Sequence, residues 1–325
     1  MNGFFLGADV GSTHTRVLIS DQAGKLIGYG ENGPGNHEMV GYEGFTQALK
    51  EASDQALYAL GIEKSQIMGA GFGVSGYDWS LEREATVQAI YKLGINAPFE
   101  LVNDTLLGLI AGSQRGWGIV IISGSGCNCR GWDKYHTCEG RVTGAGTFMG
   151  EGAGASELMD KVIHALAYEW TQRGETTALT PALMEYVGAH SLADLLEGLI
   201  NQRYTLDASA VPLVFQVAQK GDPVAVNLLA WAGNELGELA KAVIRQLGFK
   251  DLAFEIILSG GMFEGGALLI DPLKQNVLKF APRAVFVRLT TKPVVGAVLL
   301  GMQAAGVSTD EARQRLKGLL RLDGE

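Results

Sequence analysis

The chain has 325 residues, 47% of them apolar and 19% charged, which excludes a disordered segment and indicates a globular protein of about two domains. Its 26 Lys and Arg against 35 Asp and Glu give a net charge of −9. Such a surface repels nucleic acid and anionic membranes, so we expect neither as a partner. Three cysteines are too few for a disulfide framework, and with no signal peptide before Asp9 they indicate a cytoplasmic protein.

Segments rich in β-forming residues and segments with helical periodicity follow one another in the order βββαβαβα over the first third of the chain. The predicted strands cover residues 4–10, 15–20, 25–29, 67–74 and 99–102. The predicted helices cover residues 42–60 and 80–93 and a stretch that begins after Asn103-Asp104. This order predicts one α/β unit.

The rest of the chain repeats this order, with additional helices in the middle. Strands are predicted at residues 118–122, 128–132, near Arg141, at 254–258 and at 284–289, and helices at 268–280 and 293–304. Residues 151–247 have a helical pattern. We therefore predict two domains that arose by duplication. The first covers residues 1–113 and 308–325, with a returning helix over 309–320, and the second covers residues 114–307, with the helical insertion at about 151–247.

Two hairpin turns in matching positions of the repeat are made of glycine and hydroxyl-bearing residues. The first turn holds Gly11, Ser12 and Thr13, and the second holds Ser125 and Gly126. Small residues let backbone N–H groups surround phosphate oxygens, and hydroxyl groups add donors without adding charge. Two such turns facing each other predict a clamp for a polyphosphate. Asp9, in an otherwise apolar strand, is predicted to hold Mg²⁺ beside the phosphates.

An alternative function comes from the spacing of Gly71, Gly73 and Gly76, which matches the GxGxxG pattern of dinucleotide-binding folds. In those folds the glycine turn runs straight into a helix, and the N-terminus of that helix binds the pyrophosphate. Here residues 77–80 separate the glycines from the next predicted helix. The pattern is therefore weak evidence for a dinucleotide site, and the chain also lacks the GxxxxGK[ST] phosphate loop.

A set of short motifs extends over nearly the whole chain: GADVGSTHTR, GNHE, VSGYD, NDTLLG, ISGSGCNCR, TGAGTFMGEGAG, GDP and LSGGMFEG. In these motifs the chain resembles the N-acetylglucosamine kinases of the BadF/BadG-type ATPase family, within the actin, Hsp70 and sugar-kinase superfold. The resemblance implies two actin-like (ribonuclease H-like) α/β domains, with ATP and Mg²⁺ bound between them. It also implies phosphorylation of an amino sugar, with N-acetylglucosamine as the first candidate and glucosamine and N-acetylmuramic acid as alternatives.

The resemblance also implies roles for individual residues. Asp104 matches the general base that takes the proton of the sugar hydroxyl, although an aspartate here is also typical of a helix N-cap. The residues implied to bind the sugar are Asn36, His37, Ser75, Gly76, Asp104, Cys127, Asn128, Gly144, Gly146 and Glu151. The residues implied to bind ATP are Gly11, Ser12, Thr13, Ser125, Gly126, Ala218, Gly260 and Gly261.

One segment departs from the family pattern. Where the family has GWG and then GDEGS, this chain has Gly144-Ala145-Gly146 and then residues 150–154, so an aromatic residue is missing and an Asp is lengthened to Glu151. This departure puts the identity of the amino sugar in question.

A second class of function stays open, because some relatives in the family carry iron–sulfur clusters and are ATPases that activate acyl-CoA dehydratases. The spacing of Cys127, Cys129 and Cys138 is poor for shared ligation of a metal or cluster. The chain also lacks the glycine, glutamine and aspartate string of those activators. The sequence does not give the oligomeric state, and a homodimer is one alternative.

Overall fold

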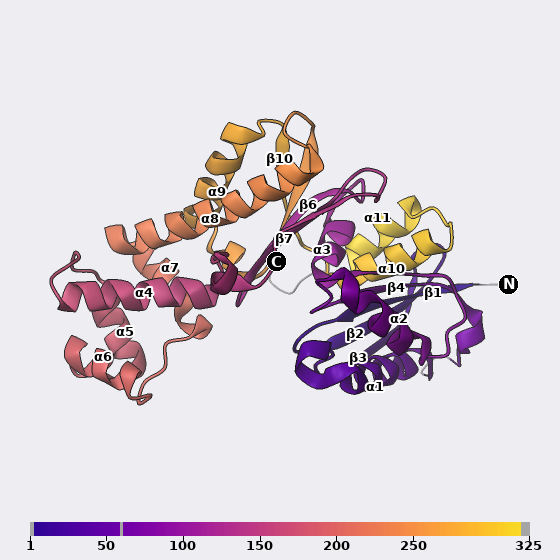
Figure 1. Ribbon diagram of the computed structural model, residues 1–325, viewed down its shortest axis with the longest axis horizontal. Coiled ribbons are helices and arrows are strands. Elements are labelled where there is room, and N and C mark those ends of the chain that lie inside the picture. Colours follow the sequence, from indigo (N-terminus) through magenta and orange to yellow (C-terminus); the bar gives the residue numbers. More distant parts are fainter. Residues whose placement is uncertain (1–2, 59–60, 320–325) are drawn as a thin grey trace.

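The structure is a computed structural model that describes residues 3–58 and 61–319 (Figure 1). The predicted helices over residues 42–60 and 309–320 therefore end outside the described residues. Two five-stranded sheets form the framework, with the strand orders β3-β2-β1-β4-β5 and β8-β7-β6-β9-β10. In each sheet the first three strands of the chain are antiparallel and the last two join them in parallel. This identical order confirms the predicted α/β fold class with its internal repeat.

The strands lie close to their predicted positions. The first sheet contains β1 (Phe4–Val10), β2 (Thr15–Asp21), β3 (Leu26–Asn32), β4 (Ile67–Val74) and β5 (Phe99–Asn103). The second sheet contains β6 (Gly118–Ser123), β7 (Cys127–Trp132), β8 (Glu139–Arg141), β9 (Phe254–Ser259) and β10 (Ala284–Arg288). Short 3₁₀ turns lie at Lys64–Gln66, Ser80–Glu82, Gly146–Met149, Ala208–Ala210 and Gly261–Gly265.

Helices cover both faces of the first sheet. α1 (His37–Tyr58) and α2 (Arg83–Tyr91) lie on one face, and α10 (Val294–Ala304) crosses β1 and β4 on the other. Because side chains alternate along a strand, Leu6 of β1 belongs to the core under α1, whereas Phe5 belongs to the core under α10. α1 begins five residues before its prediction, across a break at Gly41 with φ 68° and ψ 172°.

Glycines let the backbone of α10 lie directly on the first sheet. A Cβ atom on Gly71 would come within 2.1 Å of the Ala297 carbonyl oxygen, and one on Gly7 within 2.2 Å of the Val298 nitrogen. Gly69 has the same constraint against the carbonyl oxygen of Gly301. Within the GxGxxG pattern, Gly71 therefore follows from the packing of α10 on β4, Gly73 lies against the Leu107 side chain, and Gly76 is a turn residue with φ +80°. No dinucleotide turn is needed to explain this spacing.

The position of α10 changes the expected path of the chain. α10 follows β10 of the second sheet, so the chain returns to the first sheet at residues 289–293, before this helix. α11 (Asp310–Leu319) lies beside it, with Ala312 and Leu316 in the same hydrophobic cluster. The returning terminal helix was predicted, whereas the crossing was expected at residue 308. The division into residues 1–113 with 308–325 and residues 114–307 stays a prediction.

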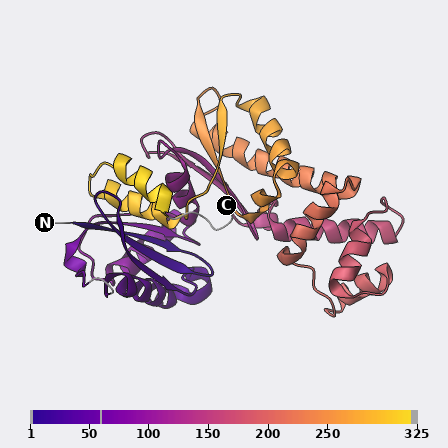
Figure 2. The same ribbon diagram turned by 180° about the vertical axis from the view of Figure 1, so that it is seen from behind.

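The second sheet is also covered on both faces. α8 (Pro223–Leu247) and α9 (Ala267–Phe280) lie on one side, and α3 (Asp104–Gly112) lies on the other, between the two sheets. The remaining helices α4 (Ala155–Trp170), α5 (Leu179–Val187), α6 (Leu192–Ile200) and α7 (Val211–Gln219) belong to the predicted helical insertion. Both ribbon views show α4, α5 and α6 extending away from the first sheet (Figures 1 and 2).

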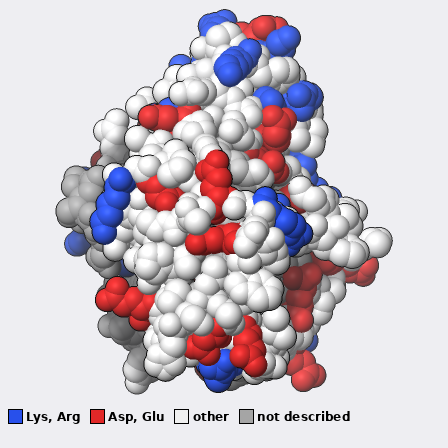
Figure 3. All heavy atoms as spheres, turned by 90° about the vertical axis from the view of Figure 1, so that its left-hand side faces the viewer, with Lys and Arg blue, Asp and Glu red and all other residues white. Residues whose placement is uncertain are grey.

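Charged side chains lie mostly on the surface, and a few, among them Arg313, are buried. On the side where the helical insertion projects, basic and acidic side chains are interspersed (Figure 3). Across residues 3–58 and 61–319, none of the helices has both the length and the apolar character needed to cross a membrane. Arg313 of α11 is only 6% exposed and donates hydrogen bonds to the carbonyl oxygens of Ile110 and Ser113. It thereby holds the C-terminal end of α3.

Candidate active site

The carboxyl ends of β1, β4 and β5 meet at one edge of the first sheet. The three strands are parallel and in register, with Asp9 beside Gly73 and Val74 beside Asn103. Asp9, Ser75 and Asp104 therefore come together from three separate parts of the sequence. This edge is where open α/β sheets usually bind their ligands.

Ser12, Asn36 and Ser75 form one hydrogen-bonded group at this edge. The Asn36 side-chain amide lies 3.2 Å from the Ser12 hydroxyl and 3.5 Å from the Ser75 hydroxyl, and the two hydroxyl groups are 3.2 Å apart. Asn36 Oδ1 accepts a hydrogen bond from the Glu38 amide, which fixes the orientation of the side chain. Gly76 has φ +80°, and a Cβ atom there would lie 2.5 Å from Asn36 Oδ1. A turn residue predicted for ATP and two residues predicted for the sugar thus lie in direct contact.

Other predicted residues around this group differ in exposure. Ser12 and Thr13 are exposed in the turn between β1 and β2, which is closed by a hydrogen bond from the Gly11 amide to the His14 carbonyl oxygen. His37 is the first residue of α1, and its ring stacks on Tyr42 with centroids 4.7 Å apart. His37 Nδ1 is buried and has no hydrogen-bond partner within the described residues.

Asp104 is the first residue of α3, and the cap of this helix is its neighbour. Asn103 Oδ1 accepts a hydrogen bond of 3.0 Å from the Thr105 amide, so Asn103 is the N-cap that the sequence also allowed for Asp104. Burial raises the pKa of Asp104 to about 6, while the Thr105 amide and the charge of Arg130 act in the opposite direction. The Asp104 carboxylate is therefore free of the capping role and titrates near neutral pH.

The pKa of Asp9 is raised further above its ordinary value than the pKa of Asp104. Burial, and to a smaller extent the negative charge of Asp104, raises the pKa of Asp9 to about 7, while the charge of Arg16 acts in the opposite direction. A partly buried carboxylate beside a second carboxylate is unfavourable unless a positive charge joins them. The two carboxylates therefore carry negative charge that a bound cation would neutralise.

The second predicted turn is held against the start of α4. The carbonyl oxygens of Gly124 and Ser125 accept hydrogen bonds from the Ala155 and Ser156 amides at 2.8 and 3.0 Å. A Cβ atom on Gly154 would lie 2.4 Å from Gly126 Cα, so the close approach requires glycine. This contact leaves Ser125 and Gly126 exposed at the tip.

A cavity of about 510 Å³ adjoins this turn. Ser125 and Gly261, both predicted to bind ATP, lie in its wall, and Gly260 packs on the Ser123 carbonyl oxygen beside it. Ala218, also predicted to bind ATP, is 3% exposed in the hydrophobic core and does not line the cavity. Residues that the sequence reasoning missed complete the wall: Phe215, Gln216, Gln219, Met262 and Glu264. One feature of the sequence could have identified this wall. At helical spacing, one face is shared by Pro212, Phe215, Gln216 and Gln219.

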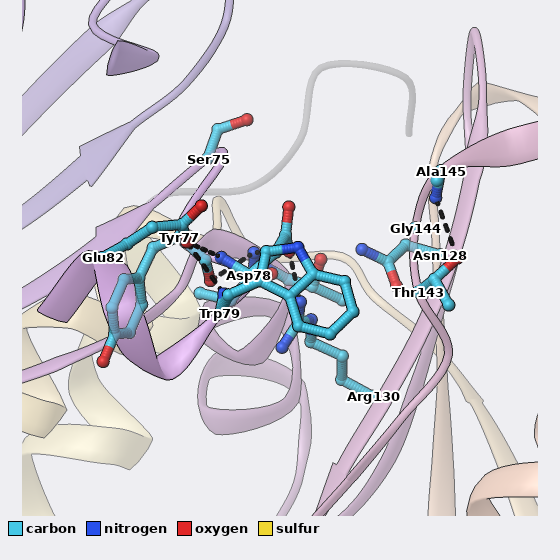
Figure 4. A network of polar contacts seen from close by, with 12 residues as sticks. Ser75, Tyr77, Asp78, Trp79, Glu82, Asn128, Arg130, Thr143, Gly144 and Ala145 are labelled. Atoms are coloured by element: carbon cyan, nitrogen blue, oxygen red, sulfur yellow. Dashed lines mark hydrogen bonds and ion pairs between the residues drawn. The ribbon is translucent and has the colours of Figure 1, made fainter. Parts of the chain in front are cut away.

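The remaining predicted sugar residues lie on β7 and in the loop that follows β8. Figure 4 shows Asn128 and Gly144 of this group. Glu151 is 7% exposed, and its carboxylate accepts hydrogen bonds from the Thr143 amide, the Thr143 hydroxyl and the Gly144 amide, at 2.7 to 2.9 Å. Gly144 and Gly146 both have positive φ, and Gly144 packs against the Asn128 side chain. Glu151 thus binds its own chain and shapes the loop beside Asn128.

Cys127 and Cys129 belong to the core, whereas Cys138 is exposed. The Cys127 sulfur accepts a hydrogen bond of 3.3 Å from the Ala153 amide, and burial raises the pKa of this thiol to about 11. Cys129 is fully buried, and burial likewise raises its pKa. Within the described residues no cluster of three or more His, Cys, Asp or Glu side chains could hold a metal ion.

A buried ion pair next to Asp104 was not predicted. Arg130 of β7, 1% exposed, pairs with Asp78 and, at 2.5 Å, with Glu139. Asp78 also accepts a hydrogen bond of 3.1 Å from Asn103 (Figure 4). The available signal was a single arginine in a strand of apolar and small residues, because such a charge is buried only when it is paired.

A smaller cavity of about 200 Å³ lies beside this ion pair. Its wall includes Asp78, Trp79, Asn103, Arg130 and Arg141. The Trp79 side chain is 53% exposed, and the Arg141 guanidinium lies over its ring, 4.8 Å from the centroid. An aromatic face and a cation are therefore both available at the rim.

Comparison with known protein families gives a match over most of the chain. The model of the BadF/BadG/BcrA/BcrD ATPase family matches residues 6–301. A relative from Dictyostelium discoideum, named N-acetyl-D-glucosamine kinase, is 27% identical over 314 residues, which cover 92% of this chain and 98% of the relative. A relative from Clostridium acetobutylicum, named N-acetylmuramic acid/N-acetylglucosamine kinase, is 26% identical over 302 residues and covers 91% of this chain and 97% of the relative.

Solved structures share the same architecture. A protein from Chromobacterium violaceum, with a provisional assignment as an N-acetylglucosamine kinase, has a TM-score of 0.62 and 24% identity over 92% of this chain and 99% of its own. The ROK hexokinase of Thermus thermophilus has a TM-score of 0.51 and 16% identity over 93% of this chain and 99% of its own. At these identities the similarity concerns the fold alone, and it agrees with the predicted α/β fold built on two sheets.

Proposed function

The chain belongs to the BadF/BadG/BcrA/BcrD ATPase family, and from this premise we propose that it is an ATP-dependent kinase that phosphorylates an amino sugar, N-acetylglucosamine first. The observation that carries the proposal is the position of Asp104, a carboxylate free of capping, at the strand edge where Ser12, Asn36 and Ser75 meet. The names of the two relatives from Dictyostelium discoideum and Clostridium acetobutylicum support the substrate class.

Asp104 is proposed as the general base. With a pKa of about 6, it is mostly ionised at pH 7 to 8 and still close enough to neutrality to accept a proton efficiently. Asp104 takes the proton of the sugar hydroxyl as the hydroxyl oxygen attacks the γ-phosphorus, and ADP leaves. Phosphoryl transfer depends mainly on orientation and charge, so the Asn36 and Asn128 amides serve by holding the sugar hydroxyl groups in place.

ATP is proposed to bind between the two turns. The exposed turns at Ser12-Thr13 and Ser125-Gly126 supply amides and hydroxyl groups for the phosphates, and the cavity of about 510 Å³ beside Ser125 accommodates the nucleoside. Ligands shared by the two sheets require the parts of the chain to close on each other. The predicted domains, residues 1–113 with 308–325 and residues 114–307, are the proposed moving bodies.

Mg²⁺ is proposed to lie at Asp9. The residues fit such an ion, because a carboxylate oxygen is its preferred protein ligand and the pKa of Asp9, raised to about 7 by burial and by the charge of Asp104, records an unbalanced negative charge. When bound, the ion would neutralise charge on the phosphates. Mg²⁺ commonly takes one or two carboxylates together with substrate phosphates and water, so Asp9 can serve as the protein ligand.

The test is a substrate panel. Purified protein is supplied with ATP, Mg²⁺ and one sugar at a time, ADP release is followed in a coupled assay, and the product is identified by mass spectrometry. We expect an amino sugar to raise ADP release several-fold, with one sugar phosphate formed per ADP. ADP release that no sugar changes would refute the kinase and favour the ATPase that activates a partner enzyme.

N-acetylmuramic acid is a second candidate, which a specific observation favours. Arg141 has no ion-pair partner among the described residues and stacks on Trp79 at the cavity of about 200 Å³. A cation in this position could bind the carboxylate of the lactyl group, and Ala145 in place of the aromatic residue of the family leaves space. Arg141→Gln should then raise the KM for N-acetylmuramic acid and leave that for N-acetylglucosamine unchanged. Equal effects on both sugars would remove this candidate.

A further inference from the structure

Arg130 joins the two halves of the candidate site. It lies on β7 of the second sheet, and its guanidinium pairs with Asp78, which follows β4 of the first sheet, and with Glu139 of β8. A guanidinium that is 1% exposed is stable only when it is well paired. The pair therefore links the first and second sheets at this point.

Asp78, the partner of Arg130, is also held by hydrogen bonds to other residues. Asp78 accepts a hydrogen bond from Asn103, and Asn103 accepts one from the Thr105 amide as the cap of α3. The backbone amides of Asp78 and Trp79 both donate to Glu82, at 2.8 Å each. A continuous series of contacts thus leads from Arg130 through Asp78 and Asn103 to the first turn of α3, where Asp104 lies. Figure 4 shows Arg130 and Asp78 at the start of this series.

The same arginine also fixes Asn128. Residues two apart in a strand point to the same face of a sheet, so Asn128 and Arg130 share one face of β7, while Cys127 and Cys129 lie in the core on the other. The anchor of Arg130 on Asp78 therefore sets where Asn128 lies relative to Asp104.

We propose that Arg130 is the positioning residue of this enzyme: through Asp78 and Asn103 it aligns the base Asp104 with Asn128 across the two sheets. The proposal rests on the proposed kinase function. Asp104 is also surrounded by charges from each neighbouring element: Asp9 of β1, Asp78 after β4, and Arg130 of β7. Glu139 of β8 pairs with Arg130 further out, and Arg141 of the same strand lies at the cavity rim.

These charges predict the direction in which each substitution shifts the pKa of Asp104. The positive charge of Arg130 lowers the pKa of Asp104 and the negative charge of Asp78 raises it, beneath the larger effect of burial. Arg130→Met should therefore move the acid limb of the kcat/KM pH profile to higher pH, and Asp78→Asn should move it to lower pH. Such shifts show that Arg130 and Asp78 act on Asp104 through their charges, and the alignment itself is tested by a variant that keeps the charge of Arg130.

Arg130→Lys keeps the positive charge but loses the planar guanidinium, which pairs with Asp78 and Glu139 at the same time. We expect kcat/KM for the sugar to fall about 100-fold, as is common when a reacting group is displaced by about 1 Å, with the acid limb in place and the KM for ATP unchanged. Arg313→Met is the matched control, because Arg313 is similarly buried at the opposite end of α3. It should lower stability without moving the limb.

The outcomes separate this proposal from the proposed function. Shifts of the same sign in Arg130→Met and Asp78→Asn, or wild-type kcat/KM in Arg130→Lys, would overturn the positioning role. If Arg130→Met does not fold, Arg130→Lys and Asp78→Asn decide. If the wild type phosphorylates no sugar, the proposed function fails. The pKa of Asp104, measured by carboxyl NMR in the free variants, then still shows whether Arg130 and Asp78 act on it with opposite signs.

Discussion

Asp9→Asn is expected to make the protein more stable above neutral pH. Burial and the charge of Asp104 raise the pKa of Asp9 to about 7, above its value in an unfolded chain. Between these two values the folded state binds more protons than the unfolded state, so the free energy of unfolding falls as the pH rises. Asparagine carries no charge at any pH and removes this penalty.

The size of the gain follows from the pKa. A rise from 3.8 to about 7 corresponds to about 4 kcal/mol at 1.36 kcal/mol per pKa unit. Asp9 keeps some contact with solvent, and the effective dielectric near a protein surface is high. We therefore expect about 2 kcal/mol at pH 8, with the gain shrinking as the pH falls toward 4.

Urea denaturation followed by circular dichroism between pH 5 and pH 8 measures this gain. Asp133→Asn is the matched control, because hydrogen bonds from the Cys138 amide and Thr137 lower the pKa of Asp133. The same substitution there should lower stability at pH 8. The prediction is refuted if the free energy of unfolding has the same pH dependence in the wild type and Asp9→Asn and is equal at pH 8. The negative charge of Asp9 would then carry no energetic penalty in the folded state.

Three further outcomes follow from the site. Asp104→Asn should lower kcat by 100-fold or more with little change in ATP affinity, and near-normal turnover would remove Asp104 as the base. Glu151→Gln places an NH₂ group against amide donors of residues 143–144, so steady-state kinetics should show a higher KM for the sugar and a nearly unchanged kcat; the reverse pattern would assign Glu151 to the chemical step. In solution scattering, sugar with a non-hydrolysable ATP analogue should reduce the radius of gyration, whereas equal radii with and without ligands would exclude domain closure.

Most strands could be predicted because their signal is local. The alternation of apolar residues and the turns of glycine and polar residues identify β1, β2 and β4 in the sequence, and the repetition of this order gives the second sheet. The end of β5 and the start of α3 likewise bring Asp104 to the edge predicted for it.

Contacts between distant segments could not be predicted in this way. The salt bridge between Arg130 and Asp78 joins residues that are 52 apart in the sequence, and nothing near Arg130 indicates its partner. Gly71 and Gly73 have the spacing of a ligand-binding turn, but their small size serves the close approach of α10 to Gly71 and of Leu107 of α3 to Gly73. Ala218 was assigned by resemblance, and only the rotation of α7 decides that Gln219 rather than Ala218 lines the cavity.

The contact of α10 with the first sheet also determines when that sheet can be completed during protein synthesis. A nascent chain generally folds from its N-terminal end as it leaves the ribosome. All five strands of the first sheet exist once residue 103 has been made, but the face along Gly7 and Gly71 stays uncovered until residues 294–304 follow. The second sheet and its helical insertion therefore have their whole sequence available before the first sheet has the helix that covers this face. A chain truncated between β10 and α10 would contain all strands of the second sheet but would leave the apolar face of the first sheet under α10 exposed. Chaperones and proteases recognise such exposed apolar surfaces.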